Sequence, residues 1–204
     1  FKNHTIYDVG SSIGIFTQFF SASIKKQNLV FSFEPNPEPY NFLLDRIGKD
    51  IGPNVRAYNF AFGKEDSEGE MMVSHEHSAT GSLDKKIKDD LNKNGKTYKI
   101  KVPIKSLDTF TENQSHKHNP TFIKIDAEGF EYDILKGAEK YLKSNKPKLF
   151  IEIHGADHNH KLKNIKKVFN FLNKSNYLIF HIESNQYLNS MNYSIAKEGH
   201  LYCQ

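Results

Sequence analysis

The sequence predicts an α/β fold with a mostly parallel central sheet, an antiparallel C-terminal edge and helices on both faces. Short apolar segments typical of strands alternate with segments whose apolar residues recur at helical spacing. A polar stretch interrupts this alternation once, in the middle of the chain. The last two strand-like segments follow each other without a helix between them, which is typical of antiparallel strands added to the edge of a parallel sheet.

The length of the chain fits one domain. A core built from 204 residues is large enough to be stable on its own, so we expect a single domain over residues 1–204. The chain begins with Phe1 and the first predicted strand follows almost at once. We therefore expect this domain to be part of a longer reading frame.

Two strand and helix pairs and a third strand open the chain. Gly10 breaks the first strand, and Pro35 and Pro37 stop the second before a helix. The predicted elements are strands over residues 5–10, 28–34 and 54–60 and helices over residues 13–26 and about 38–48.

The middle of the chain is the least regular part. Residues 70–74 form a strand, whereas residues 75–96 show no clear pattern. Polar and apolar residues alternate over 99–104, which predicts a half-exposed antiparallel strand that pairs with residues 70–74. Ser106 then caps a short helix that runs to about Glu112.

Regular alternation resumes after this region. The predicted elements are strands over residues 121–126 and 147–154, helices over residues 130–142 and 161–174, and closing strands over residues 177–183 and 194–202. The last helix is amphipathic, so it covers one face of the sheet.

The composition limits the possible compartments and partners. Cys203 is the only cysteine and cannot form an internal disulfide, so we expect a cytoplasmic protein. No apolar run is long enough to span a bilayer, and residues 1–4 are not a basic stretch followed by the apolar core of a signal peptide, so we expect a soluble protein. The net charge of +4 comes from dispersed lysines, which is typical of solvated helix faces, and a nucleic-acid partner is not expected.

The segment between the first strand and the first helix carries a cofactor signal. Residues 8–14 read DVGSSIG, and Glu34 follows at the tip of the second strand. In a Rossmann-like unit such glycines let the backbone approach a ligand, and an acid at the next strand accepts hydrogen bonds from ribose hydroxyls. The alternative is that the glycines only permit a tight turn and that Glu34 is an ordinary exposed acid. The two signals together favour a nucleoside-type cofactor.

The details of this loop favour S-adenosylmethionine over a nicotinamide dinucleotide. Ser12 replaces the glycine that a pyrophosphate-binding loop needs. Asp8 would repel a phosphate, but it could anchor the ammonium of a methionine moiety, directly or through water.

A block of acids predicts a catalytic site at the carboxyl edge of the sheet. Asp126 and Glu128 could orient or deprotonate an acceptor hydroxyl, and His154, at the end of the next strand, is a second candidate base. Some of these groups could only align the acceptor, because methyl transfer needs in-line positioning. For Glu131 we favour a structural role at the start of the following helix.

We expect no metal site. His154, Asp157, His158 and His160 match no closed zinc pattern, and no cysteine is near them. His75 and His77 lie in a polar loop and are more typical of solvated residues than of ligands, although such a loop often lines an acceptor pocket.

Three motifs resemble those of the FkbM-type methyltransferases in order and spacing, and together they span most of the chain. They are residues 8–17 (DVGSSIGIFT), residues 33–37 (FEPNP) and residues 123–131 (IKIDAEGFE) with Gly137 and Ala138, supported by residues 107–109 and 151–154. Ser11 and Ser12 stand where the family commonly has Ala and Asn, which changes the hydrogen bonds available to a cofactor.

The resemblance implies a Rossmann-like class I methyltransferase fold, usually with seven strands, that transfers a methyl group mostly to oxygen acceptors. It also implies cofactor contacts. Asp8, Gly10 and Gly14 would hold the methionine end of S-adenosylmethionine, Glu34 the ribose, and Asn59, Ala61 and Phe62 the surroundings of the adenine.

We therefore predict an S-adenosylmethionine-dependent O-methyltransferase with a small-molecule or glycan acceptor. An RNA or protein methyltransferase is an alternative suggested by the excess of lysine, and an inactive cofactor-binding or partner-binding module is another, suggested by the altered loop. An NAD-dependent dehydrogenase is a more distant alternative. The sequence leaves the acceptor's identity and the oligomeric state open.

Overall fold

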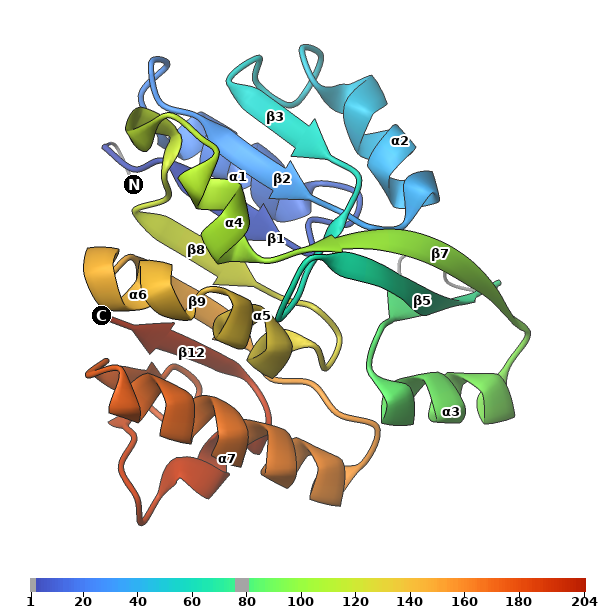
Figure 1. Cartoon of the computed structure of the whole chain (residues 1–204), viewed down its shortest axis with the longest axis vertical. Coiled ribbons are helices and arrows are strands. Elements are labelled where there is room, and N and C mark those ends of the chain that lie inside the picture. The colour runs from blue at the N-terminus through green and yellow to red at the C-terminus, as the bar shows by residue number, and fades with distance from the viewer. Residues whose placement is uncertain (1–2, 76–80) are drawn as a thin grey trace.

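A computed structural model of the chain, described here for residues 3–75 and 81–204, has an eight-stranded central sheet (Figure 1). The strand order is β11-β10-β12-β9-β8-β1-β2-β3. The bounds are Ile6–Val9 (β1), Val30–Phe33 (β2), Val55–Tyr58 (β3), Phe122–Ile125 (β8), Lys148–Glu152 (β9), Ile179–His181 (β10), Gln186–Tyr187 (β11) and His200–Cys203 (β12). β1, β2, β3, β8 and β9 pair in parallel, and β10, β11 and β12 pair antiparallel. The predicted mixed sheet is confirmed, with the two-residue β11 as an additional edge strand.

Helices cover both faces of the sheet (Figure 1). The bounds are Ile15–Ser23 (α1), Pro37–Arg46 (α2), Leu107–Glu112 (α4), Glu131–Gly137 (α5), Glu139–Asn145 (α6) and His158–Lys174 (α7). Successive strand side chains point to opposite faces. Ile6 therefore packs with buried residues of α1 and α2, whereas its neighbour Tyr7 packs with buried residues of α4 to α7.

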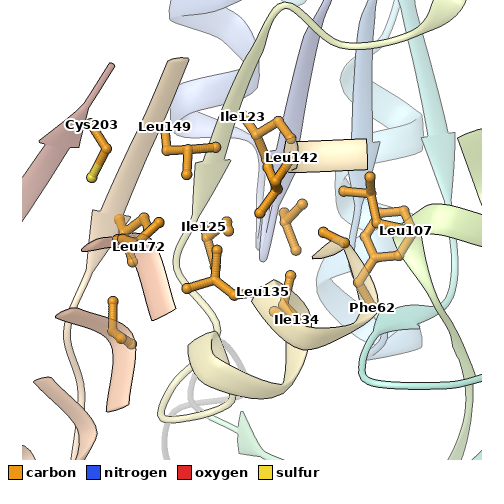
Figure 2. Packing of buried hydrophobic residues seen from close by; sticks show 14 of the residues in the cluster. Phe62, Leu107, Ile123, Ile125, Ile134, Leu135, Leu142, Leu149, Leu172 and Cys203 are labelled. Atoms are coloured by element: carbon orange, nitrogen blue, oxygen red, sulfur yellow. The ribbon is translucent and has the colours of Figure 1, made fainter. Parts of the chain in front are cut away.

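The larger core lies between the sheet and helices α4 to α7. Figure 2 shows Ile123 and Ile125 of β8 facing Ile134 and Leu135 of α5, with Leu142, Leu149, Leu172 and Cys203 nearby. Phenylalanine fills the end of this core near β2. The Phe33 ring lies 4.6 Å from the Phe62 ring and 5.3 Å from the Phe110 ring, between centroids. Aromatic pairs at these separations add to the stabilisation that apolar burial provides.

A smaller sheet extends from the central one. Its strand order is β4-β7-β5-β6, with bounds Ala61–Phe62 (β4), Ser67–Ser74 (β5), Gly81–Ser82 (β6) and Thr97–Lys105 (β7). β5 pairs antiparallel with β7 along its whole length, as the alternating pattern predicts. The two strands reach away from the central sheet, and the helix Lys85–Asn94 (α3) lies at their far end (Figure 1).

Several predicted boundaries are corrected by local chemistry. The helix predicted over 130–142 divides into α5 and α6 at Ala138, where φ is −108°. Gly137, before this break, lies so close to Gly63 that a Cβ would be 1.9 Å from the Gly63 carbonyl oxygen. α7 begins at His158 instead of residue 161, because Asp157 accepts a hydrogen bond from the backbone N–H of His160.

The end of the chain also differs from the prediction. Residues Tyr193–Lys197 form a 3-10 helix, and only His200–Cys203 form the last strand. The predicted cap of α4 is confirmed, because Ser106 accepts a hydrogen bond from the backbone N–H of Thr109. In the part of the chain that the structure describes, no helix has the length and apolar character needed to cross a membrane.

Candidate active site

A cavity of about 300 Å³ opens at the carboxyl ends of β1, β2 and β8. Ligands of open α/β sheets bind at this edge. Apolar side chains form one part of the wall, and acidic side chains together with glycine and serine residues form the other. The lining residues are Val9, Gly10, Ser12, Phe33, Glu34, Pro35, Phe60, Ala61, Phe62, Met71, Gly81, Leu83, Asp126, Ala127, Glu128, Phe130 and Ile134.

The loop between β1 and α1 forms the floor of the cavity. Gly10 has a φ of +72°, and its N–H donates to the carbonyl oxygen of Phe33 at 3.0 Å. A Cβ at this position would lie 1.7 Å from the carbonyl oxygen of Asp126, so no other residue fits. Gly14 instead faces Leu43 in the core below α1 and does not line the cavity.

Glu34 is held rigidly in the cavity wall. Its side chain is 6% exposed, and its two carboxylate oxygens accept hydrogen bonds from the backbone N–H groups of Ser12 at 2.9 Å and Asn36 at 2.8 Å. Burial raises the pKa of Glu34 to about 7, against the opposing effect of these two bonds. The Asn59 amide donates to the carbonyl oxygens of Glu34 and Pro35 and so fixes the end of β2 from outside the cavity.

A buried lysine links the loop between β1 and α1 to Asp126, which follows β8. Lys124 is 2% exposed, and its Nζ lies 3.2 Å from Asp8 Oδ1 and 3.3 Å from Asp126 Oδ2. The same Nζ donates to the carbonyl oxygen of Gly10 at 2.8 Å. Burial alone would lower the pKa of Lys124, but the carboxylates of Asp8 and Asp126 hold it above its ordinary value. Asp8 also accepts a hydrogen bond from Thr17 at 2.6 Å.

Lys124 is not among the site residues predicted from the sequence, although the sequence contains a signal for it. A charged residue in the middle of the apolar run 122–125 has no other explanation than a buried partner, and Asp8 occupies the same position in β1. Asp8 itself is fully buried and does not line the cavity, so its contact with a cofactor stays a prediction.

His154 stands among four carboxylates. Its Nδ1 lies 3.1 Å from Glu131 Oε1, and its Nε2 lies 3.5 Å from Glu152, 3.8 Å from Asp126 and 3.9 Å from Glu128. Burial lowers the pKa of His154, but the hydrogen bond to Glu131 and the negative charges of the nearby Glu152 and Glu128 carboxylates outweigh it and raise the pKa to about 11. The imidazole is thus protonated at neutral pH in this arrangement. Its predicted role as a base stays a prediction.

Glu131 has a larger part in this cluster than the sequence suggests. It is 1% exposed, and its Oε1 accepts a hydrogen bond from the backbone N–H of Gly129 at 2.9 Å while it faces His154. The predicted structural role at the start of α5 is therefore present, together with a contact to His154 that only the folded sheet creates.

Glu128 adopts an unusual backbone conformation at the mouth of the cavity. Its φ is +48°, which non-glycine residues rarely adopt, and Gly129 follows with a φ of +97°. The Ser82 hydroxyl donates to the carbonyl oxygen of Glu128 at 2.6 Å. Burial raises the pKa of the Glu128 carboxyl.

The structure gathers some of the predicted site residues and separates others. Those that line the cavity are Gly10, Ser12, Glu34, Ala61, Phe62, Asp126 and Glu128, and those outside its lining are Asp8, Gly14, Asn59 and His154. The roles predicted for them stay predictions. His75 packs against the Tyr98 ring at 4.7 Å between centroids, and His77 lies outside the described residues. Of the histidines near α7, only His154 joins a group with metal-ligand spacing among the described residues, together with Asp126 and Glu152.

The strand order, the glycine loop after β1 and the acid after β2 at one cavity define a Rossmann-like α/β protein of the class I methyltransferase type. The family model of the methyltransferase FkbM domain matches residues 8–193. The chain therefore belongs to the FkbM methyltransferase family, as the sequence motifs predict.

Two curated relatives are similar over most of this chain. One is Methyltransferase 1 of Beauveria bassiana, 23% identical over 145 residues that cover 66% of this chain. The other is the hexuronic acid methyltransferase AglP of Haloferax volcanii, 29% identical over 161 residues that cover 76% of this chain. In each case the match spans 58% of the relative's length.

Solved structures support the fold. An FkbM methyltransferase from Methylobacillus flagellatus superposes with a TM-score of 0.62 at 17% identity, covering 100% of this chain and 44% of that one. A precorrin-6y C5,15-methyltransferase from Geobacter metallireducens superposes with a TM-score of 0.53 at 12% identity, covering 99% and 78% of the two chains. The predicted class I methyltransferase fold is confirmed.

Proposed function

We propose that the protein is an S-adenosylmethionine-dependent O-methyltransferase that acts on a hydroxyl of a carbohydrate or another small polar acceptor. The observation that carries the proposal is the division of the cavity wall. Phe60, Phe62 and Pro35 offer an apolar surface, Glu34 stands at one end, and Asp126 and Glu128 line the wall near the carboxyl end of β8.

Each part of this wall suits a different part of S-adenosylmethionine. The apolar residues suit an adenine ring, and Glu34 has lone pairs free for ribose hydroxyls beyond its two backbone bonds. Carboxylates favour the positive sulfonium and ammonium groups. No lysine or arginine is among the described lining residues, so a pyrophosphate would meet only negative charge, which argues against NAD.

The residues of the chain would divide the chemistry among them. When bound, S-adenosylmethionine supplies a methyl group on a sulfonium, which passes to the acceptor oxygen as the carbon–sulfur bond breaks. Glu128 is suited to take the hydroxyl proton, because burial raises the pKa of its carboxyl above the ordinary value and so makes it a stronger base. Asp126 is held by Lys124 and His154 and is suited to orient the acceptor in line with the methyl group.

The choice of acceptor class rests on the relative from Haloferax volcanii, which is named for methylation of a hexuronic acid. A sugar presents several hydroxyls, and the acidic and histidine groups beside the cavity offer both acceptors and donors of hydrogen bonds to them.

Calorimetric titration with S-adenosylmethionine and with NAD tests the cofactor. We expect saturable binding of S-adenosylmethionine alone, weakened at least tenfold in Glu34→Ala and unchanged in Glu112→Ala, an exposed carboxylate on α4. A screen of hexuronic acids and neutral sugars with methyl-labelled cofactor then tests the acceptor. Preference for NAD would overturn the cofactor, and transfer only to nitrogen acceptors would overturn the O-methylation.

A further inference from the structure

Three potential metal ligands converge beside the cavity. Donor atoms of Asp126, Glu152 and His154 all lie within 4.8 Å of one another. His154 Nε2 is 3.5 Å from Glu152 Oε1 and 3.8 Å from Asp126 Oδ1, which is too long for strong hydrogen bonds. Donors that share one cation at bonds of about 2.1 Å lie roughly 3 to 3.5 Å apart. The two His154 separations lie within a few tenths of an ångström of this range, and the donor oxygens of Asp126 and Glu152 lie no more than 4.8 Å apart.

A second, independent observation is that each ligand is held from behind. Asp126 keeps its Oδ2 on Lys124 at 3.3 Å, and Glu152 keeps its Oε2 near His200 Nε2 at 3.4 Å. His154 has its Nδ1 on Glu131 at 3.1 Å. The second polar atom of each side chain is the one that converges with the other two, namely Asp126 Oδ1, Glu152 Oε1 and His154 Nε2. A carboxylate behind the far nitrogen of a histidine is the usual outer support of a metal-bound imidazole.

The local charge balance also calls for a cation. Among the described residues, the carboxylates of Asp8, Asp126, Glu128, Glu131 and Glu152 have three ion-pair partners, which are Lys124, His154 and His200. Glu131 Oε2 is buried with no hydrogen-bond partner among the described residues. Asp8 and Glu131 are buried, and buried carboxylates are costly unless positive charge compensates them.

We propose that Asp126, Glu152 and His154 form a site for a divalent cation that prefers oxygen ligands, Mn²⁺ or Mg²⁺. The cation takes the place of the proton on His154 Nε2, while Nδ1 donates to Glu131. Two carboxylates and one imidazole without cysteine suit these ions better than zinc in a structural site. Three protein ligands leave coordination positions for two oxygens of one acceptor, such as a vicinal diol or a hydroxy acid. This last role rests on the proposed function.

The site is tested by titrating chelator-treated full chain with Mn²⁺, without cofactor or acceptor, and following bound ion by electron paramagnetic resonance. We expect one saturable site. Glu152→Gln should weaken it at least tenfold, Glu131→Gln about 10- to 100-fold, and the control Glu112→Gln not at all. Circular dichroism confirms that each variant is folded. Because Glu152 does not line the cavity, Glu152→Gln should bind S-adenosylmethionine within about twofold of the wild type.

The outcomes separate this inference from the proposed function. Absence of Mn²⁺ binding, or binding that Glu152→Gln leaves intact, overturns the metal site even if methyl transfer is observed. Mn²⁺ binding lost in Glu152→Gln supports the site even if no acceptor is methylated, in which case only the proposed function fails. Methyl transfer that is abolished by chelator and restored by Mn²⁺ supports the acceptor role, and transfer indifferent to chelator overturns that role.

Discussion

Lys124 shows how strongly one buried residue can depend on its partners. Replacing it by Met would leave Asp8 without its ion pair in a fully buried position and would remove one of the two cationic partners of Asp126. Removing one partner of a buried pair typically costs about 3 to 5 kcal/mol of unfolding free energy. We therefore expect Lys124→Met to lower the unfolding free energy by this amount in urea denaturation.

A matched control separates burial from simple loss of charge. Lys101 forms an exposed ion pair with Glu68 at 3.1 Å on the β5 and β7 strands, so Lys101→Met should cost no more than about 1 kcal/mol. The double variant Asp8→Asn with Lys124→Met should recover part of the lost stability, because the uncompensated charge is gone. Equal effects of the two lysine substitutions would show that Lys124 is not held as described.

Glu34 predicts a pH dependence of cofactor affinity. Its pKa is raised to about 7 by burial, so in the free protein the carboxyl becomes protonated as the pH falls through 7. The ionised form accepts hydrogen bonds more strongly than the neutral acid by about 1 kcal/mol or more. S-adenosylmethionine should therefore bind about fivefold to tenfold more weakly at pH 5.5 than at pH 8 in calorimetric titrations.

The variant Glu34→Gln supplies the control for this prediction. It keeps the shape of the side chain but cannot ionise, so its weaker affinity should stay level over the same pH range apart from the titration of the ligand itself. A pH profile shared by Glu34→Gln and the wild type would assign the dependence to another group.

At the scale of elements, the small sheet is coupled to the acid block through β6. Ser82 Oγ donates to the Glu128 carbonyl oxygen and accepts from the Asp84 N–H at 3.0 Å. Ser82→Ala removes both bonds and releases Glu128 from its positive φ. We expect a fall in kcat/KM of about tenfold with a loss of only about 1 kcal/mol in unfolding free energy.

Steady-state kinetics beside urea denaturation check this coupling. Ser67→Ala, an exposed serine in β5 whose hydroxyl contact at 3.4 Å is long, is the control and should change neither quantity measurably. If kcat/KM falls in proportion to the unfolding free energy in both variants, the role of Ser82 is only structural and the predicted coupling is wrong.

The elements predicted well from the sequence are strands whose side chains are mostly buried. β1, β2, β8 and β9 are short runs in which apolar side chains face two layers of helices, and their positions follow from the apolar segments of the sequence. α3 escaped prediction because its sequence, KKIKDDLNKN, is almost entirely polar and its main buried anchor is Ile87. The break at Ala138 depends on the approach of Gly63, which is remote in sequence.

At the scale of the whole molecule, a ligand that binds only the folded state must stabilise all of it. At a concentration one hundred times its Kd, S-adenosylmethionine should add about 2.7 kcal/mol to the unfolding free energy. For a chain of 204 residues this corresponds to a rise in Tm of roughly 5 to 10 °C, measured by differential scanning calorimetry. NAD at the same concentration should leave the Tm unchanged, and an equal rise with NAD would contradict the cofactor assignment.

Part of the candidate site could be predicted from the sequence, because several of its residues follow strands of the predicted sheet. Gly10, Glu34 and Asp126 end neighbouring strands, so their meeting follows once a parallel sheet is assumed. The meeting of Glu152 with His200 depends on the antiparallel register of β12 against β9, which local patterns do not determine. The contact between His154 and Glu131 could not be predicted for the same reason. Glu131 begins α5 and His154 follows β9, so the two side chains meet only when this helix packs on the sheet.

The ion pair of Asp8 with Lys124 has a consequence for how the chain folds. β1 lies between β2 and β8, and β8 enters the sheet only after the chain has made its excursion through the small sheet. Until β8 is in place, burial of the Asp8 carboxylate is unfavourable, because the positive charge of Lys124 is not yet beside it. Contacts between such distant segments form slowly, because loop closure must precede them. We therefore expect the loop between β1 and α1 to be among the last regions to gain protection from hydrogen exchange during refolding, so a ligand of this loop should not initiate the folding of a nascent chain.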